Sequence, residues 1–166
     1  MTYEQLKKEP VFKYFDEISK IPHGSGNMKK ITEYCLDFAK KHSLKAYSDD
    51  AGNVIIYKDG NGSCKDSAPV ILQGHLDMVC QKTHESKIDF EKDGIEVFLD
   101  GDFLKANGTT LGADNGIAVA MILSILADKT LNHPPIEACF TTDEEIGMIG
   151  AGKLDFSKLS AKRMIN

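Results

Sequence analysis

The sequence predicts an α/β fold in which helices flank a layered, mixed β-sheet. Two segments near the N-terminus have apolar residues at helical spacing, and two short continuous apolar runs are typical of strands buried on both faces. A third apolar segment of helical length lies between those runs. The chain has 166 residues, of which 42% are apolar, which is enough for one domain with a real core.

The first third of the chain is expected to form two helices and two strands. Apolar residues recur at helical spacing in 11–20, directly after a proline, and in 27–42, where Asn27 can cap the helix. Residues 44–48 and 53–58 read as strands because a turn rich in Asp and Gly joins them.

The remaining elements follow from the same patterns. Runs of apolar residues predict inner strands, loose alternation predicts a β-ribbon, and a longer apolar segment predicts a buried helix. In chain order we expect a strand at 69–74, a ribbon at 88–105, a helix at 116–128, a strand at 135–141, a short helix at 148–154 and the start of a strand at 161–166.

Composition narrows the class of protein. Lys plus Arg is 20 and Asp plus Glu is 25, so the net charge of -5 argues against nucleic acid or an anionic membrane as the main partner. The four cysteines form no C-x-x-C pair, which is typical of reduced thiols in a cytoplasmic protein. No signal peptide is visible at the N-terminus, and the longest apolar run, 117–127, is too short to cross a bilayer.

The first motif with residue types suited to catalysis or metal binding is Gln-Gly-His-Leu-Asp at residues 73–77, which closes an apolar run. Side chains two positions apart on a strand point to the same face, so Asp77 is expected to reach one ring nitrogen of His75 and leave the other for a metal ion. Ligands collect beyond the carboxyl ends of strands in open α/β sheets. The alternative is a partly buried histidine that is simply paired with its neighbouring aspartate.

Two further acidic motifs lie at the ends of predicted elements. Asp114 precedes an apolar helix, where it is either an N-cap or a carboxylate shared between two metal ions. Glu144 and Glu145 follow an inner strand, and adjacent side chains point in different directions, so one could bind metal while the other acts as a base. Their alternative is a solvated helix start, where acidic residues are favoured.

The three motifs together favour a metal site over three unrelated structural roles, because each lies where an α/β site is built. The other histidines, at positions 23, 42, 84 and 133, are expected to be solvated rather than liganding. Cys80 lies near the His75 motif, and an inert buried thiol is the expected state. A Rossmann-type nucleotide binder is disfavoured because no G-x-G-x-x-G follows a strand.

The motifs resemble those of a known family. Residues 73–79 (Gln-Gly-His-Leu-Asp-Met-Val), 111–116 (Leu-Gly-Ala-Asp-Asn-Gly) and 142–147 (Thr-Asp-Glu-Glu-Ile-Gly) are similar to motifs of the di-zinc exopeptidases related to aminoacylase and carboxypeptidase G. Within that group the resemblance is to the aminoacyl-histidine dipeptidases, and residues 18–22 and 25–27 are also similar. The likeness covers essentially the whole chain.

The resemblance implies a role for each site residue. His75 would bind one zinc ion, Asp114 would bridge two and Glu145 would bind the other, with manganese or cobalt as alternatives to zinc. Asp77 would orient His75, and Glu144 would be the general base that takes a proton from a metal-activated water. The family also implies a cis peptide bond between Asp114 and Asn115.

The resemblance further implies that residues 1–166 are the N-terminal part of a metallopeptidase catalytic domain, incomplete without a lid domain and a C-terminal half. In the family, an aspartate in a strand resembling residues 163–166 and a histidine near the C-terminus of a much longer chain complete the ligand set. Neither is present in residues 1–166, so weak metal binding and little activity are expected of these residues alone. The expected reaction is hydrolysis of Xaa-His dipeptides of the carnosine type. A tripeptidase, an N-acyl amino acid deacylase and a non-catalytic scaffold remain alternatives, and a homodimer is possible.

Overall fold

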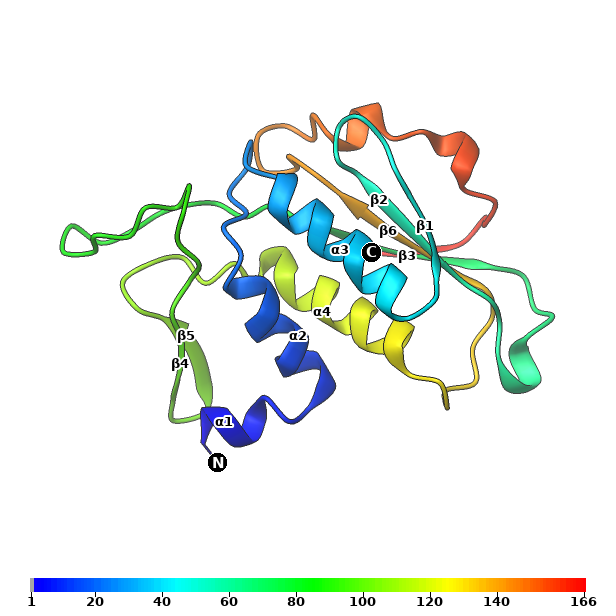
Figure 1. The fold of residues 1–166 in the computed structure, drawn as a ribbon, viewed down its shortest axis with the longest axis horizontal. Coiled ribbons are helices and arrows are strands. Elements are labelled where there is room, and N and C mark those ends of the chain that lie inside the picture. The colour runs from blue at the N-terminus through cyan, green and yellow to red at the C-terminus, as the bar shows by residue number, and fades with distance from the viewer. Residues whose placement is uncertain (1) are drawn as a thin grey trace.

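A five-stranded mixed sheet is the centre of the structure, a computed structural model that describes residues 2–166 (Figure 1). Its strands lie in the order β1-β2-β6-β3-β7. The first two pairings are antiparallel, whereas β3 runs parallel to both β6 and β7. The strands are β1 (Lys45–Ser48), β2 (Val54–Lys58), β3 (Val70–His75), β6 (Ile136–Thr141) and β7 (Met164–Ile165). The predicted mixed α/β fold is confirmed.

Helices cover one face of this sheet. The main core packs side chains of three helices against inward residues of β2 and β6, including Val54, Ile56, Ala138 and Phe140. Helix α2 packs on α4, and α3 packs on β1 and β2 (Figure 1). The helices are α2 (Pro10–Ser19), α3 (Lys29–Lys41) and α4 (Ala113–Ala127), preceded by the single turn α1 (Tyr3–Leu6).

Helix α4 connects the two central parallel strands, β3 and β6, together with the hairpin formed by β4 (Val97–Asp100) and β5 (Phe103–Ala106). It is apolar on nearly all sides, as expected of a helix packed between a sheet and a second helix. A parallel connection of this kind brings the carboxyl ends of both strands and the start of the helix to the same edge of the sheet.

Among residues 2–166, the segment after β6 is what covers the opposite face of the sheet. A small second core of Ile55, Ile71, Cys139 and Leu154 lies there. Beside it is a cavity of about 810 Å³ that extends to the edge of the sheet at the end of β3. Several apolar side chains around this face are largely exposed to solvent, namely Met148, Phe156 and Met164.

A buried carboxylate from β6 fixes the approach to β7. Glu137 is 6% exposed and accepts hydrogen bonds from the backbone N–H groups of Ser160 and Ala161 and from the Ser160 hydroxyl. Strand β7 itself pairs with β3 through only two residues, so this carboxylate supplies much of the alignment of the segment.

Several local expectations were wrong. The helix expected to begin at Asn27 begins at Lys29 with Met28 as N-cap and no side-chain cap. The ribbon expected over 88–105 is limited to β4 and β5, because the hydrogen bonds donated by the backbone of residues 88–95 are local or, from Ile95, go to Ser19 at the end of α2. The short helix expected at 148–154 is a 3₁₀ turn. Helix α1 and the 3₁₀ turns at 62–64 and 156–158 were not predicted, because these short segments have no periodic pattern of apolar residues.

Among residues 2–166, no helix combines the length and the apolar character that crossing a membrane requires.

Candidate metal centre

The three sequence motifs meet at one edge of the sheet, where β3 and β6 end and α4 begins. His75 is the last residue of β3 and lies opposite Thr141, the last residue of β6, in the parallel register. Residues 142–147, which we call the acidic turn, follow β6 and carry Glu144 and Glu145. Asp114 arrives from the first turn of α4.

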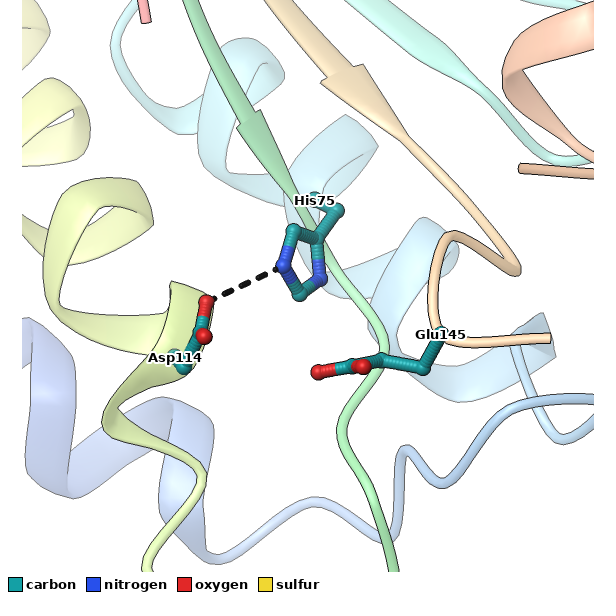
Figure 2. Close-up of side chains that lie close together, drawn as sticks. All are labelled: His75, Asp114 and Glu145. Carbon is teal, nitrogen blue, oxygen red and sulfur yellow. Dashed lines mark hydrogen bonds and ion pairs between the residues drawn. The ribbon is translucent and has the colours of Figure 1, made fainter. Parts of the chain in front are cut away.

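His75, Asp114 and Glu145 point toward a common space (Figure 2). One potential ligand atom from each lies within 4.8 Å of the others, and His75 Nε2 is 3.2 Å from Asp114 Oδ1. The Glu144 carboxylate lies at the same place, with Oε2 3.9 Å from His75 Nε2. One imidazole with carboxylate oxygens is a donor set that suits zinc and also manganese. The residues therefore fit a divalent metal site.

Asp114 and Asp77 sit in opposite surroundings. The side chain of Asp114 is 85% exposed, and His75 is its one ion-pair partner among the described residues. The side chain of Asp77 is fully buried. An exposed carboxylate can receive a cation without losing structural bonds, whereas a buried one serves the fold around the site.

The expected contact between Asp77 and His75 differs in detail. His75 Nδ1 is 2.9 Å from the backbone carbonyl oxygen of Asp77, and the carboxylate Oδ1 is farther away, at 3.5 Å. The strand ends at His75, so the rule that alternate side chains share a face no longer holds two residues on. The ring nitrogen Nε2 still faces the site, as the prediction required.

The buried carboxylate of Asp77 instead holds the acidic turn. It accepts hydrogen bonds from the backbone N–H groups of Glu144 and Glu145, at 3.0 and 3.1 Å, and from the Ser25 hydroxyl at 2.7 Å. The Asp77 side chain thus links the segment that follows β3 to the turn that follows β6. These hydrogen bonds fix the backbone positions of Glu144 and Glu145.

The pKa values of His75 and Asp77 are shifted in opposite directions. Burial by itself lowers the pKa of His75, but hydrogen bonds to Asp77 and the nearby Glu144 charge outweigh burial and raise it to about 9. Burial by itself raises the pKa of Asp77, but hydrogen bonds from His75, the acidic turn and Ser25 hold it well below its usual range. Asp77 therefore stays ionised across the physiological range.

The backbone at the start of α4 brings Asp114 close to β3. Gly112 is left-handed, with φ of 70°, and Asp114 and Asn115 have non-helical dihedral angles. The peptide bond between Asp114 and Asn115 is cis, which confirms the expectation from the resemblance. The Asp114 side chain accepts no hydrogen bond from the helix backbone and among the described residues bonds only to His75, so the simple N-cap alternative for Asp114 does not hold.

Gly74 makes this close approach possible, and its replacement by alanine tests that role. A Cβ at this position would lie 2.6 Å from Asn115 Oδ1 and 3.4 Å from Val119 Cγ2. We expect Gly74→Ala to displace the start of α4, to cost about 1–3 kcal/mol of unfolding free energy and to weaken metal binding. Urea unfolding and metal titration would measure the two effects. Gly152→Ala, where a Cβ meets nothing within 4 Å, is the matched control and should change neither.

Two of the histidines expected to be solvated are buried. His23 is 4% exposed and its Nδ1 contacts the carbonyl oxygen of Ile21, while His133 is 6% exposed with Nδ1 near the Pro134 carbonyl. Both lie beside prolines in loops whose backbone pairs with another loop segment, which local polarity does not reveal. Cys80 is half-buried. The sequence also gave no separate role to Ser25 or Asp143, which contact the site as described below.

The fold and the clustered donors together define a candidate metal-binding domain of the α/β class. Residues 71–163 match the model described as Peptidase family M20/M25/M40, and the chain belongs to this family. The resemblance seen in the motifs is thereby confirmed.

Known relatives support the family assignment. The chain is 42% identical over 162 residues to the cytosol non-specific dipeptidase of Escherichia coli, covering 98% of this chain and 33% of that protein. The structure of an aminoacylhistidine dipeptidase from Vibrio alginolyticus superposes with a TM-score of 0.90 at 39% identity, covering 93% of this chain and 32% of that one. A tripeptidase from Staphylococcus aureus shares the fold, with a TM-score of 0.78 at 21% identity over 94% of this chain and 42% of that chain. The chain thus spans about a third of the length of the first two.

Proposed function

We propose that the full-length protein is a metal-dependent dipeptidase that hydrolyses Xaa-His dipeptides. The observation that carries the proposal is the convergence of His75, Asp114 and Glu145 on one space in a chain of this peptidase family. The names of the E. coli and V. alginolyticus relatives support dipeptides as the substrate class, and the second supports histidine at the C-terminal position.

In this proposal the site holds two divalent cations, with zinc as the expected metal. His75 would bind one, Glu145 the other, and Asp114 would lie between them, where a shared carboxylate offsets the repulsion of two close cations. The backbone oxygen of Asp77 would orient the His75 ring through its contact with Nδ1. The Asp77 carboxylate would place a negative charge close to that ring. When bound, the cations would acidify a water molecule and polarise the scissile carbonyl group.

Glu144 is the proposed general base. Its carboxylate reaches the site, with Oε2 3.9 Å from His75 Nε2, and it borders the same cavity as Asp114 and Glu145. It would accept a proton from the attacking water at one carboxylate oxygen and then deliver that proton to the amine nitrogen of the leaving amino acid. Its backbone N–H bond to Asp77 holds the residue in place during both transfers.

Removal and return of metal test the proposal on the full-length protein. Treatment with a chelator is expected to abolish hydrolysis of a carnosine-type dipeptide, and added zinc or manganese should restore it. Hydrolysis that continues in the chelated protein would contradict a metal-dependent mechanism. Magnesium, which prefers all-oxygen sites that keep several waters, is the control metal and should restore little activity.

A substrate panel separates the alternatives. Dipeptides with and without C-terminal histidine, a tripeptide and an N-acyl amino acid would be compared by kcat/KM. Preference for the tripeptide or the acyl amino acid would replace the proposed substrate class within the same chemistry. A protein that binds zinc but hydrolyses none of the four would favour a non-catalytic scaffold.

The cellular setting is part of the same proposal. We place the protein in the cytoplasm, as the name of the E. coli relative supports, with a small peptide as its partner. Fractionation of cells that express the tagged full-length protein, followed by detection of the tag, would test this location.

A further inference from the structure

The loop between α2 and α3 contacts the metal centre from the N-terminal side. Residues 23–27, which we call the N-terminal loop, run beside the segment that follows β3. The backbone N–H of Met78 donates to the carbonyl oxygen of His23, at 3.2 Å, and Gly24 forms a parallel bridge with Met78. The loop is thereby held next to Asp77 and to the acidic turn.

Ser25 is the side chain of this loop that reaches Asp77. Its hydroxyl donates to Asp77 Oδ2 at 2.7 Å, the shortest of the hydrogen bonds that this carboxylate accepts. The same oxygen accepts the Glu145 N–H, while Oδ1 accepts the Glu144 N–H. Loss of the hydroxyl would remove one of the two hydrogen bonds to Oδ2, so the carboxylate and the two N–H groups bonded to it would shift.

Gly26 holds the acidic turn at a second point. Its backbone N–H donates to Asp143 Oδ1 at 2.7 Å. Asp143 is a non-glycine residue with φ of 52°, a left-handed conformation that L-residues adopt only with support. Gly26 has φ of 85° itself, so its backbone conformation directs the N–H toward the turn. Asp143 directly precedes Glu144, so this bond sets the direction in which the backbone continues into Glu144 and Glu145.

We propose that Ser25 and Gly26 are positioning residues of the metal centre. Neither touches His75, Asp114 or Glu145 through a hydrogen bond among the described residues. Ser25 acts through Asp77 and Gly26 through Asp143, and together they fix the acidic turn relative to the imidazole of His75. The N-terminal loop thus sets the distance between the ligands that come from β3 and from the acidic turn. This inference rests on the proposed metal site.

Cobalt(II) titration of the full-length, metal-free protein tests the inference, because the visible spectrum of bound cobalt reports ligand geometry. We expect Ser25→Ala to raise the dissociation constant for cobalt about 10-fold and to change the spectrum, as is typical when a group that orients a ligand is removed. Ser25→Thr restores a hydroxyl donor and should recover both. Ser48→Ala, which also removes a half-buried hydroxyl but one that donates to the backbone carbonyl oxygen of Asp49, is the control.

Gly26→Ala tests the second contact. A Cβ at Gly26 meets nothing within 4 Å, so its effect would come from the left-handed backbone alone. We expect weaker cobalt binding and an altered spectrum here too. Gly101→Ala places the same strain in the β4–β5 hairpin, also with open space around the Cβ, and should leave cobalt binding unchanged.

The outcomes separate the inference from the proposed function. Wild-type protein that binds no cobalt would contradict the metal site and this inference with it. Wild-type binding together with an unchanged affinity and spectrum in Ser25→Ala and Gly26→Ala would overturn the inference and leave the metal site standing. A lower unfolding free energy in urea with an unchanged cobalt spectrum would also overturn it, because a purely structural role predicts that result.

Discussion

Glu144→Gln is expected to lower kcat of the full-length protein about 10²- to 10⁴-fold while its metal content stays at the wild-type level. Glutamine keeps the size of the side chain and leaves the backbone N–H bond to Asp77 intact, but its amide cannot take up a proton. Steady-state kinetics on a dipeptide substrate and metal analysis of the same samples would measure both quantities.

Two further glutamate variants make this result interpretable. Glu145→Gln alters a proposed ligand, so it should lower metal content as well as activity. Glu85→Gln changes an exposed residue that does not line the cavity at the site and should alter neither. Equal metal loss in Glu144→Gln and Glu145→Gln would contradict the division of roles between the adjacent glutamates.

Asp114→Ala should separate function from stability more sharply than any other change in this chain. The side chain is 85% exposed and its one described bond is to His75, so the unfolding free energy of the metal-free protein should stay within about 0.5 kcal/mol of wild type. The carboxylate proposed to be shared by both cations is lost, so we expect the metal content to fall from about two ions per chain to about one. Dipeptide hydrolysis should fall to background.

Metal analysis after dialysis and urea unfolding would measure the two effects of Asp114→Ala. Asp102→Ala, in the exposed turn between β4 and β5, is the control for loss of an exposed aspartate. Full metal content in Asp114→Ala would rule out a bridging role. A large drop in the stability of the metal-free protein would show that Asp114 supports the fold rather than the metals.

The sequence predicts the main elements of this fold because their apolar patterns are strong. The periodicity in 11–20 and the continuous apolar runs at 69–74 and 135–141 correspond to α2, β3 and β6. Residues 88–96 show why weak alternation misleads: Ile95 bonds to the carbonyl oxygen of Ser19 rather than to a partner strand. Alternation alone does not specify what the other edge of a strand will meet.

The residues of the candidate site were also predictable, but their contacts were not. His75, Asp114 and Glu145 stand at the ends of elements, and their convergence follows from the geometry of parallel strands. The bonds from Ser25 to Asp77 and from Gly26 to Asp143 join segments 52 and 117 positions apart in the chain. Both residues lie in segments that resemble the family, but nothing in those segments shows which side chain or backbone group each residue would contact.

The anchoring of Ser160 and Ala161 by Glu137 has a consequence for the path of the polypeptide. Because β7 runs parallel to β3, it travels toward His75, and Asn166 at its end donates to the amide oxygen of Gln73 at 2.6 Å. The Glu137 carboxylate therefore aligns the backbone of β7 so that the strand points along β3 toward the edge of the sheet where His75 lies. The contacts of Glu137 with Ser160 and Ala161 thus set the direction of the backbone before β7 begins.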